Sequence, residues 1–195
     1  MQTLTDRQHE IIDAAGLLLT RSGVNGLTIK NLAKEMSFTE SAVYRHFQSK
    51  EEIIVTLLNY LNEKIVIECK KASQEKEVED KLIAIFQNLF RFFKAHPHFV
   101  VVVFSDGLME ESQAINAGIL RLMQSKMFYI MPIIMEGQQS GKFTKKLSAE
   151  QLIHIIMGAV RLQMFKWRLS SFEMDLEKQS KPVLDAILQL ISTER

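Results

Sequence analysis

Helix-start signals recur along this chain and leave little room for other secondary structure. Hydroxyl residues stand just before segments whose apolar residues recur at helical spacing, where a side-chain oxygen can accept a hydrogen bond from the first turn. In three cases a Gln or Glu follows three residues later and completes a capping box: Thr5 with Gln8, Ser49 with Glu52, and Ser148 with Gln151. Thr28 and Thr39 precede two shorter segments. The pattern predicts an all-α fold.

The composition agrees with a helical fold, because the chain has only 8 Gly and 3 Pro in 195 residues. At a net charge of +1, charge alone indicates neither a nucleic-acid nor a membrane partner. The single cysteine, Cys69, suits a reducing cytosol, and we expect it to be inert. The start of the chain has no apolar signal segment, and the longest apolar runs (99–104 and 127–135) are shorter than the ~20 residues that span a bilayer. We therefore expect a cytoplasmic protein.

Patterns typical of catalysis or metal binding are weak. The sequence contains no nucleophile elbow, no phosphate-binding loop and no paired carboxylates that stand apart from helix-surface charge. His96 and His98 flank Pro97, but no acidic residue or cysteine stands at a convincing ligand spacing from them. We therefore predict neither an enzyme nor a metal or cofactor site.

A charged stretch at residues 68–81, ECKKASQEKEVEDK, separates two regions of different composition. We interpret it as the end of a fourth helix and a connection, and we predict two domains, residues 5–65 and 66–195. The second domain is richer in Phe and Met. Its helical patterns bring the expected total to about nine, and they cover about 82–93, 112–136, 148–170 and 180–191. FVVVVF at 99–104 is β-branched, but no partner strand is visible, so we predict a helical conformation there too.

Residues 38–52, FTESAVYRHFQSKEE, mix aromatic, basic and hydroxyl side chains in a way that no ordinary core stripe does. On a helix over 40–47, Val43 and Phe47 share the inward face, and Ser41 and Arg45 stack on the opposite face. A short amphipathic helix ends just before it, with a turn of only about three residues at 36–38. Two helices joined in this way form a helix-turn-helix, whose second helix enters the DNA major groove.

The exposed chemistry of this segment suits DNA. The planar guanidinium of Arg45 matches guanine O6 and N7, and Ser41 can meet donor or acceptor edges. Thr28 and Thr39 mark helix N-termini, whose free N–H groups bind phosphates. Lys50 can also reach the phosphate backbone of the DNA. Residues 1–50 hold six Lys/Arg and five Asp/Glu, so we expect modest non-specific affinity. A surface corner of a helical protein that never meets DNA can also look like this.

The first ~60 residues resemble the DNA-binding domain of the TetR family of bacterial repressors. The resemblance rests on IIDAAGLLL, then GVNGLT, then IKNLA, and most specifically on AVYRHFQSKEE. Beyond about residue 65 it extends to the length and all-helical character only. The resemblance implies two sets of DNA contacts. They are the base-reading residues Lys30, Ser41, Ala42 and Arg45, and the phosphate contacts Thr28, Thr39, Tyr44, His46 and Lys50.

Two positions depart from the family pattern. The turn normally has Gly where this chain has Ser37, and serine tolerates a left-handed backbone less well. Glu40 is acidic beside the expected DNA surface. It can repel phosphate, accept a hydrogen bond from a cytosine amino group, or simply favour the helix N-terminus. The last of these roles is the favoured interpretation.

The resemblance also implies a C-terminal domain that binds a small molecule and dimerises. Residues 152–167 are apolar over most of a helical circumference, which is typical of a helix buried on two sides. We predict a homodimer through the last two helices, because a palindromic operator of double-stranded DNA needs a two-fold protein.

An effector pocket is expected among Phe and Met residues of this domain, although such stripes are more often plain core. Met-rich linings suit flexible or hydrophobic ligands, and interspersed polar residues can orient a head group. The candidates are Phe86, Phe90, Phe93, Met123, Met127, Phe128, Met131, His154, Arg161 and Trp167.

Together these patterns favour a DNA-binding transcriptional regulator, a repressor released from its operator by a small, largely hydrophobic effector. An effector-independent DNA-bound factor, whose C-terminal domain recruits a protein partner, remains the alternative. Neither the operator sequence nor the effector is determined by these residues.

Overall fold

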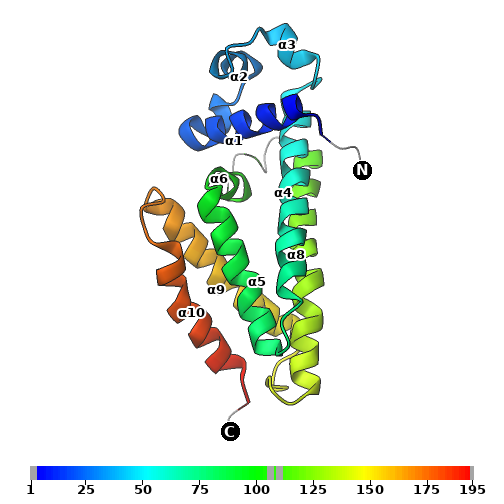
Figure 1. Cartoon of the computed structure of the whole chain (residues 1–195), viewed down its shortest axis with the longest axis vertical. Helices are drawn as coiled ribbons and strands as arrows, with labels where there is room; N and C mark the ends of the chain where they lie inside the picture. The colour runs from blue at the N-terminus through cyan, green and yellow to red at the C-terminus, as the bar shows by residue number, and fades with distance from the viewer. Residues whose placement is uncertain (1–3, 105–107, 109–111, 194–195) are drawn as a thin grey trace. The chain divides into compact units, whose positions relative to one another are not determined.

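A computed structural model gives the structure of residues 4–104, 108 and 112–193. Across these residues the chain forms nine α-helices and one isolated β-bridge (Figure 1). The helices are α1 (Asp6–Gly26), α2 (Ile29–Glu35), α3 (Glu40–Tyr44), α4 (Lys50–Ala72), α5 (Val78–Ala95), α6 (His98–Val103), α8 (Gln113–Gln139), α9 (Ala149–Leu169) and α10 (Leu176–Ile191). The predicted all-α fold is confirmed, and FVVVVF lies largely within helix α6.

The chain divides into two compact units. The first unit comprises the residues up to Glu63 together with His98–Leu122, and the second comprises Lys64–Pro97 and the residues from Met123 onward. The chain therefore enters the second unit near the predicted boundary at residue 65, returns at residue 98 and leaves again after residue 122. Helices α4 and α8 each continue from one unit into the other.

In the first unit, α1 packs against α2 and α6, and α2 packs against α3. The apolar residues of α1 that were predicted at helical spacing, among them Ile11 and Ile12, are fully buried. Gly16 allows α6 to approach α1 closely, because a Cβ atom at this position would lie 2.5 Å from Cδ2 of His98. The packing of α1 against α6 and α2 thus holds α2, and through it α3, in place.

The predicted caps at Thr5, Thr28 and Thr39 are present, whereas the predicted capping box at Ser49 is half formed, because the carboxylate of Glu52 accepts from the N–H of Gln48. Thr5 and Gln8 form a complete capping box at the start of α1. The hydroxyl of Thr28 accepts from the backbone N–H of Asn31 at 3.1 Å. Gly23 within α1 adopts a left-handed backbone (φ +64°), and a further turn follows it to the end of α1. The caps fix where α2 and α3 begin.

In the second unit, α10 packs against α5 and α9. The ammonium of Lys94 near the end of α5 lies 3.0 Å from a carboxylate oxygen of Glu177 in the first turn of α10. The prediction that Ser180 begins the last helix is wrong. Asp175 caps this helix by accepting from the N–H of Lys178 at 3.3 Å, so the helix begins one turn earlier and Ser180 is buried within it.

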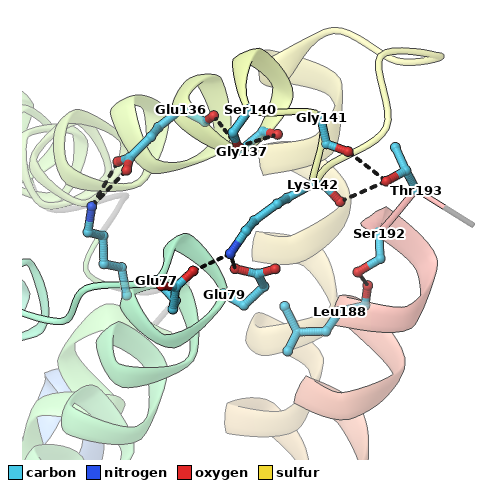
Figure 2. A network of polar contacts seen from close by, with 11 residues as sticks. Glu77, Glu79, Glu136, Gly137, Ser140, Gly141, Lys142, Leu188, Ser192 and Thr193 are labelled. Carbon is cyan, nitrogen blue, oxygen red and sulfur yellow. Dashed lines mark hydrogen bonds and ion pairs between the residues drawn. The ribbon is translucent and has the colours of Figure 1, made fainter. Parts of the chain in front are cut away.

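The connection between α8 and α9 is fixed by polar contacts at one end of the second unit (Figure 2). Lys142 pairs with Glu77 and, at 3.0 Å, with Glu79 at the start of α5. The hydroxyl of Thr193 donates to the carbonyl oxygen of Gly141 at 2.7 Å. Phe143 is fully buried beside these contacts. The connection is therefore held to both α5 and the end of α10.

Candidate nucleic-acid interface

Helix α3 is held by two apolar side chains and presents polar ones outward. Val43 is 0% exposed and Phe47 is 2% exposed, so both anchor the segment in the first unit. Ser41 and Arg45 are exposed. The N–H of Arg45 donates to the carbonyl of Ser41 at 3.3 Å, so the two lie one turn apart on the same side, as predicted. The regular helix ends at Tyr44, earlier than expected, but this bond keeps Arg45 in helical register.

The turn between α2 and α3 keeps the geometry that a glycine would give. Ser37 adopts the left-handed conformation with φ 55°. Its N–H donates to the carbonyl of Lys34 at 3.2 Å, and the N–H of Phe38 donates to that of Ala33 at 2.7 Å. This pair of bonds is a Schellman motif, which ordinarily has Gly at the left-handed position. The departure at Ser37 therefore leaves the shape of the turn intact at a cost in backbone strain.

The predicted phosphate contacts lie around this turn. Thr28 and Thr39 are exposed and cap α2 and α3. The hydroxyl of Thr39 accepts from the N–H of Ala42 at 3.2 Å, so its own O–H remains able to donate to a phosphate. Tyr44 is 50% exposed, whereas His46 is half-buried.

The free positive charge of this surface comes from a small set of residues. Arg7 lies over the Phe38 ring at 4.8 Å and pairs with Glu10, and Arg21 pairs with Glu35 at 2.8 Å. Within the described part of the chain, Lys30 and Arg45 are exposed and make no ion pair. Their charges can meet DNA without first breaking a protein contact.

The remaining DNA candidates lie close to these residues in the chain. Ala42 is half-buried on α3, and Lys50 is half-buried at the first position of α4. Glu40 is exposed in the first turn of α3, where a negative charge favours the helix N-terminus. This location agrees with the favoured interpretation, in which Glu40 stabilises the N-terminus of α3.

The effector-pocket candidates of the second unit divide by burial. One group lies in the core of the unit, namely Phe86, Phe90 and Phe93 on α5 and Trp167 on α9. Met127 and Met131 on α8 are half-buried. The others are exposed, namely Met123 and Phe128 on α8 and His154 and Arg161 on α9. Phe128 is 72% exposed, so in a single chain it lies apart from the buried Phe group.

Sequence reasoning missed Lys126, a half-buried lysine of the second unit. Burial lowers the pKa of its ammonium to about 8. Cys69 raises this pKa, and Arg161 lowers it by a smaller amount. Burial also raises the pKa of the Cys69 thiol to about 11, which suits the inert role expected for this cysteine. The signal was a lysine four residues from both Leu122 and Ile130, in the middle of an apolar stripe.

Comparison with known proteins agrees with this geometry. Residues 11–57, which include α2 and α3, match the family described as bacterial regulatory proteins, tetR family. Residues 57–190 match the family described as YsiA-like protein, C-terminal region. The chain therefore belongs to the TetR family of transcriptional regulators and is a DNA-binding regulator rather than an enzyme.

Three individual proteins show the range of relatives. The fatty acid metabolism regulator protein of Bacillus subtilis (strain 168) is 21% identical over 188 residues, 96% of this chain and 97% of its own. The nucleoid occlusion factor SlmA of Vibrio vulnificus (strain YJ016) is 25% identical over 162 residues, 80% of this chain and 83% of that protein. The Bacillus subtilis regulator FadR in complex with stearoyl-CoA has a TM-score of 0.82 at 19% identity, covering 94% and 98% of the two chains. At such low identities, the structural similarity establishes only that these proteins share a fold.

The described residues contain neither a metal-ligand cluster nor a membrane-spanning helix. No group of three or more His, Cys, Asp or Glu residues in the described ranges is placed to hold a metal ion. Nor is any helix in this part of the chain long and apolar enough to cross a membrane.

Proposed function

We propose that this regulator is a homodimeric repressor that leaves its operator when an amphiphilic acyl ligand, such as a fatty acyl thioester, binds its second unit. The observation that carries the DNA-binding part is the α3 turn, where Val43 and Phe47 are buried and Ser41 and Arg45 are exposed one turn apart. A guanidinium held in this way can donate two hydrogen bonds to one guanine, which gives sequence selectivity.

The exposed face of α9 supports the homodimer. Four large apolar side chains on this helix recur at heptad spacing and are exposed in the single chain: Ile155, Leu162, Phe165 and Leu169. Gly158 falls in the same stripe, and a Cβ atom there would meet nothing within 4 Å. Leu190 on the neighbouring α10 is also exposed. A heptad stripe of this kind packs against another helix, and a second copy supplies one with matching spacing and two-fold symmetry.

The effector class is supported by the relatives and by the interior of the second unit. The full-length relative from Bacillus subtilis is named for fatty acid metabolism, and the FadR structure holds stearoyl-CoA. The buried Phe86, Phe90 and Trp167 in this chain offer apolar and aromatic surface to an alkyl chain. An effector that prefers the released form 100-fold would supply about 2.7 kcal/mol of coupling.

A second candidate function rests on a different relative. The nucleoid occlusion factor SlmA is 25% identical over 80% of this chain. Its name refers to nucleoid occlusion and to no small-molecule effector, which is consistent with the second candidate, an effector-independent DNA-bound factor whose second unit recruits a protein partner. In the first proposal an acyl ligand releases the protein from DNA. In the second, a protein partner binds it while it stays on DNA.

The test begins with selection of genomic fragments by the purified full-length protein, which provides an operator. Fluorescence anisotropy of this operator is then measured with increasing stearoyl-CoA, with free coenzyme A as control. The repressor proposal expects stearoyl-CoA to release the DNA and to raise the melting temperature, while coenzyme A does neither. DNA binding that ignores acyl thioesters, together with a protein captured on the DNA complex, would favour the second function instead.

A further inference from the structure

Most glycines of the described ranges have a physical reason within the chain itself. Gly23 and Gly141 adopt a left-handed backbone, with φ of +64° and +76°, which few other residues tolerate. The next group lies in helices that pack closely against side chains of the same chain. A Cβ atom at any member of this group would lie 2.8 Å or less from a side-chain atom: Gly16, Gly26, Gly118 and Gly137.

Gly158, in the middle of α9, differs from the other described glycines. It is exposed, and a Cβ atom there would meet nothing within 4 Å among the described residues. Glycine is a poor helix former, because it loses much backbone entropy on folding and contributes no side-chain contact. An alanine would fit this position of the single chain and would favour the helix. The reason for a glycine at this position therefore lies outside the single chain.

The neighbours of Gly158 on the same helix face are large and apolar. Ile155 stands three residues before it and Leu162 four residues after it, and these side chains are 43% and 60% exposed. Both spacings place side chains on one face of a helix. Between two large side chains, a residue without one leaves the backbone open to close approach by another helix, since the side chains at a contact set the distance between helix axes.

The charges of α9 favour an antiparallel partner helix. Its first turn carries the acidic Glu150, and its last turn carries the basic Lys166 and Arg168. Glu150 stands eight residues before Gly158, and Lys166 stands eight residues after it. Two copies of α9 that cross antiparallel at Gly158 therefore bring the acidic end of each helix to the level of the basic end of the other. A parallel pair would place like charges together.

We propose that two copies of α9 cross antiparallel at Gly158, where the missing side chain lets the two backbones approach most closely. The inference rests on the proposed function, because it specifies one contact within the proposed homodimer. Ile155 of each copy would pack beside Leu162 of the other, since the two stand on opposite sides of the crossing. A second copy fits this face better than an unrelated helix does, because each copy supplies the large side chains that flank the glycine of the other.

The first test changes the size of residue 158 and measures the dimer dissociation constant of the full-length protein by analytical ultracentrifugation. Gly158→Ala should raise this constant at least about 10-fold and Gly158→Leu at least about 100-fold, because the added atoms hold the two helices apart. Ala117→Leu adds the same side chain at an exposed position of α8 and is the matched control, which should stay within about 2-fold of wild type. Far-UV circular dichroism shows whether each variant remains helical.

The melting temperature of Gly158→Ala separates the crossing from an uncovered helix face. At the crossing, alanine disturbs the contact between the two copies, so the melting temperature should fall at concentrations where wild type is dimeric. On an uncovered face, alanine is simply the better helix former, so the melting temperature would rise and the dissociation constant would not change. The second result would overturn the proposal.

Cross-linking tests the antiparallel direction. Cys69 is fully buried, so a cysteine introduced on the exposed face of α9 is the accessible thiol. Ile155→Cys and Leu162→Cys proteins are mixed, allowed to exchange subunits and treated with a short bismaleimide. The antiparallel crossing expects more cross-linked product from the mixed pair than from either variant alone, whereas a parallel pair would favour like positions.

The outcomes separate this inference from the homodimer on which it rests. If Gly158→Ala stays as tightly dimeric as wild type while a charge at Leu162 dissociates the dimer, the crossing at Gly158 is wrong and the proposed homodimer stands. If the wild-type protein is monomeric, or covers this face only with a protein of another sequence, both are wrong.

Discussion

The α3 turn and helix α9 both leave one face exposed, but the two faces have opposite chemistry. Ser41 and Arg45 on the α3 turn are polar and are satisfied by water until DNA replaces it. The exposed Leu162 and Leu169 of α9 are apolar and gain free energy only when another surface covers them. The first face is complete in one chain, whereas the second would be covered by another copy in the proposed homodimer.

The largest effect is expected from removing Phe47, the buried side chain that anchors the α3 turn. Phe47→Ala removes a fully buried aromatic ring, and we expect it to cost about 3–5 kcal/mol of the free energy of unfolding and to abolish operator binding. Chemical denaturation measures the loss. Tyr44→Ala, at a half-exposed aromatic ring three residues earlier, should cost less than about 1 kcal/mol of stability. Similar losses in both variants would show that the burial pattern does not govern this segment.

The apolar face of α9 is tested by placing a charge in its centre. Leu162→Glu should convert the dimer to a monomer and weaken operator binding by at least about 100-fold, because two half-sites no longer bind as one unit. Analytical ultracentrifugation and anisotropy report the two effects. Met135→Glu, at an exposed apolar residue of α8, is the control and should remain dimeric. If the Leu162→Glu protein stays dimeric, the dimer interface lies on another face.

The polar face of α3 is tested by separating base contacts from phosphate contacts. Arg45→Ala should cost about 1–3 kcal/mol and relax selectivity at one base position in each half-site. Lys50→Ala should instead weaken all sequences alike and reduce the salt dependence of binding. Binding to a library of single-base operator variants distinguishes the two. Uniform weakening by both substitutions would remove Arg45 from the base-reading set.

The smallest effect concerns the turn that orients α3. Ser37→Gly relieves a left-handed serine, and we expect it to stabilise the protein by about 0.5–1 kcal/mol without changing operator preference. Thermal denaturation and the same operator library provide the measurements. Destabilisation by this substitution would mean that Ser37 makes a contact that offsets its backbone strain.

Local signals predicted much of the fold and which side chains of the α3 turn are exposed. Capping boxes at Thr5 and Ser148 correctly marked the starts of α1 and α9, because a cap depends on residues only three apart. The inward Val43 and outward Arg45 followed from helical periodicity alone. The same approach misplaced the last helix, since Ser180 and Asp175 are both good caps in isolation. Only the packing of α10 against α5 and α9 buries Ser180 and leaves Asp175 at the helix start.

By itself the sequence determined the helices, the helix-turn-helix and its exposed side chains, because these depend on contacts within a turn or two of helix. The tertiary structure decided which long apolar stripes are covered. It buried Phe86 and Phe90 and left Leu162 and Phe128 exposed. Burial of a side chain depends on residues far away in the chain, and no local pattern records which helix will lie opposite.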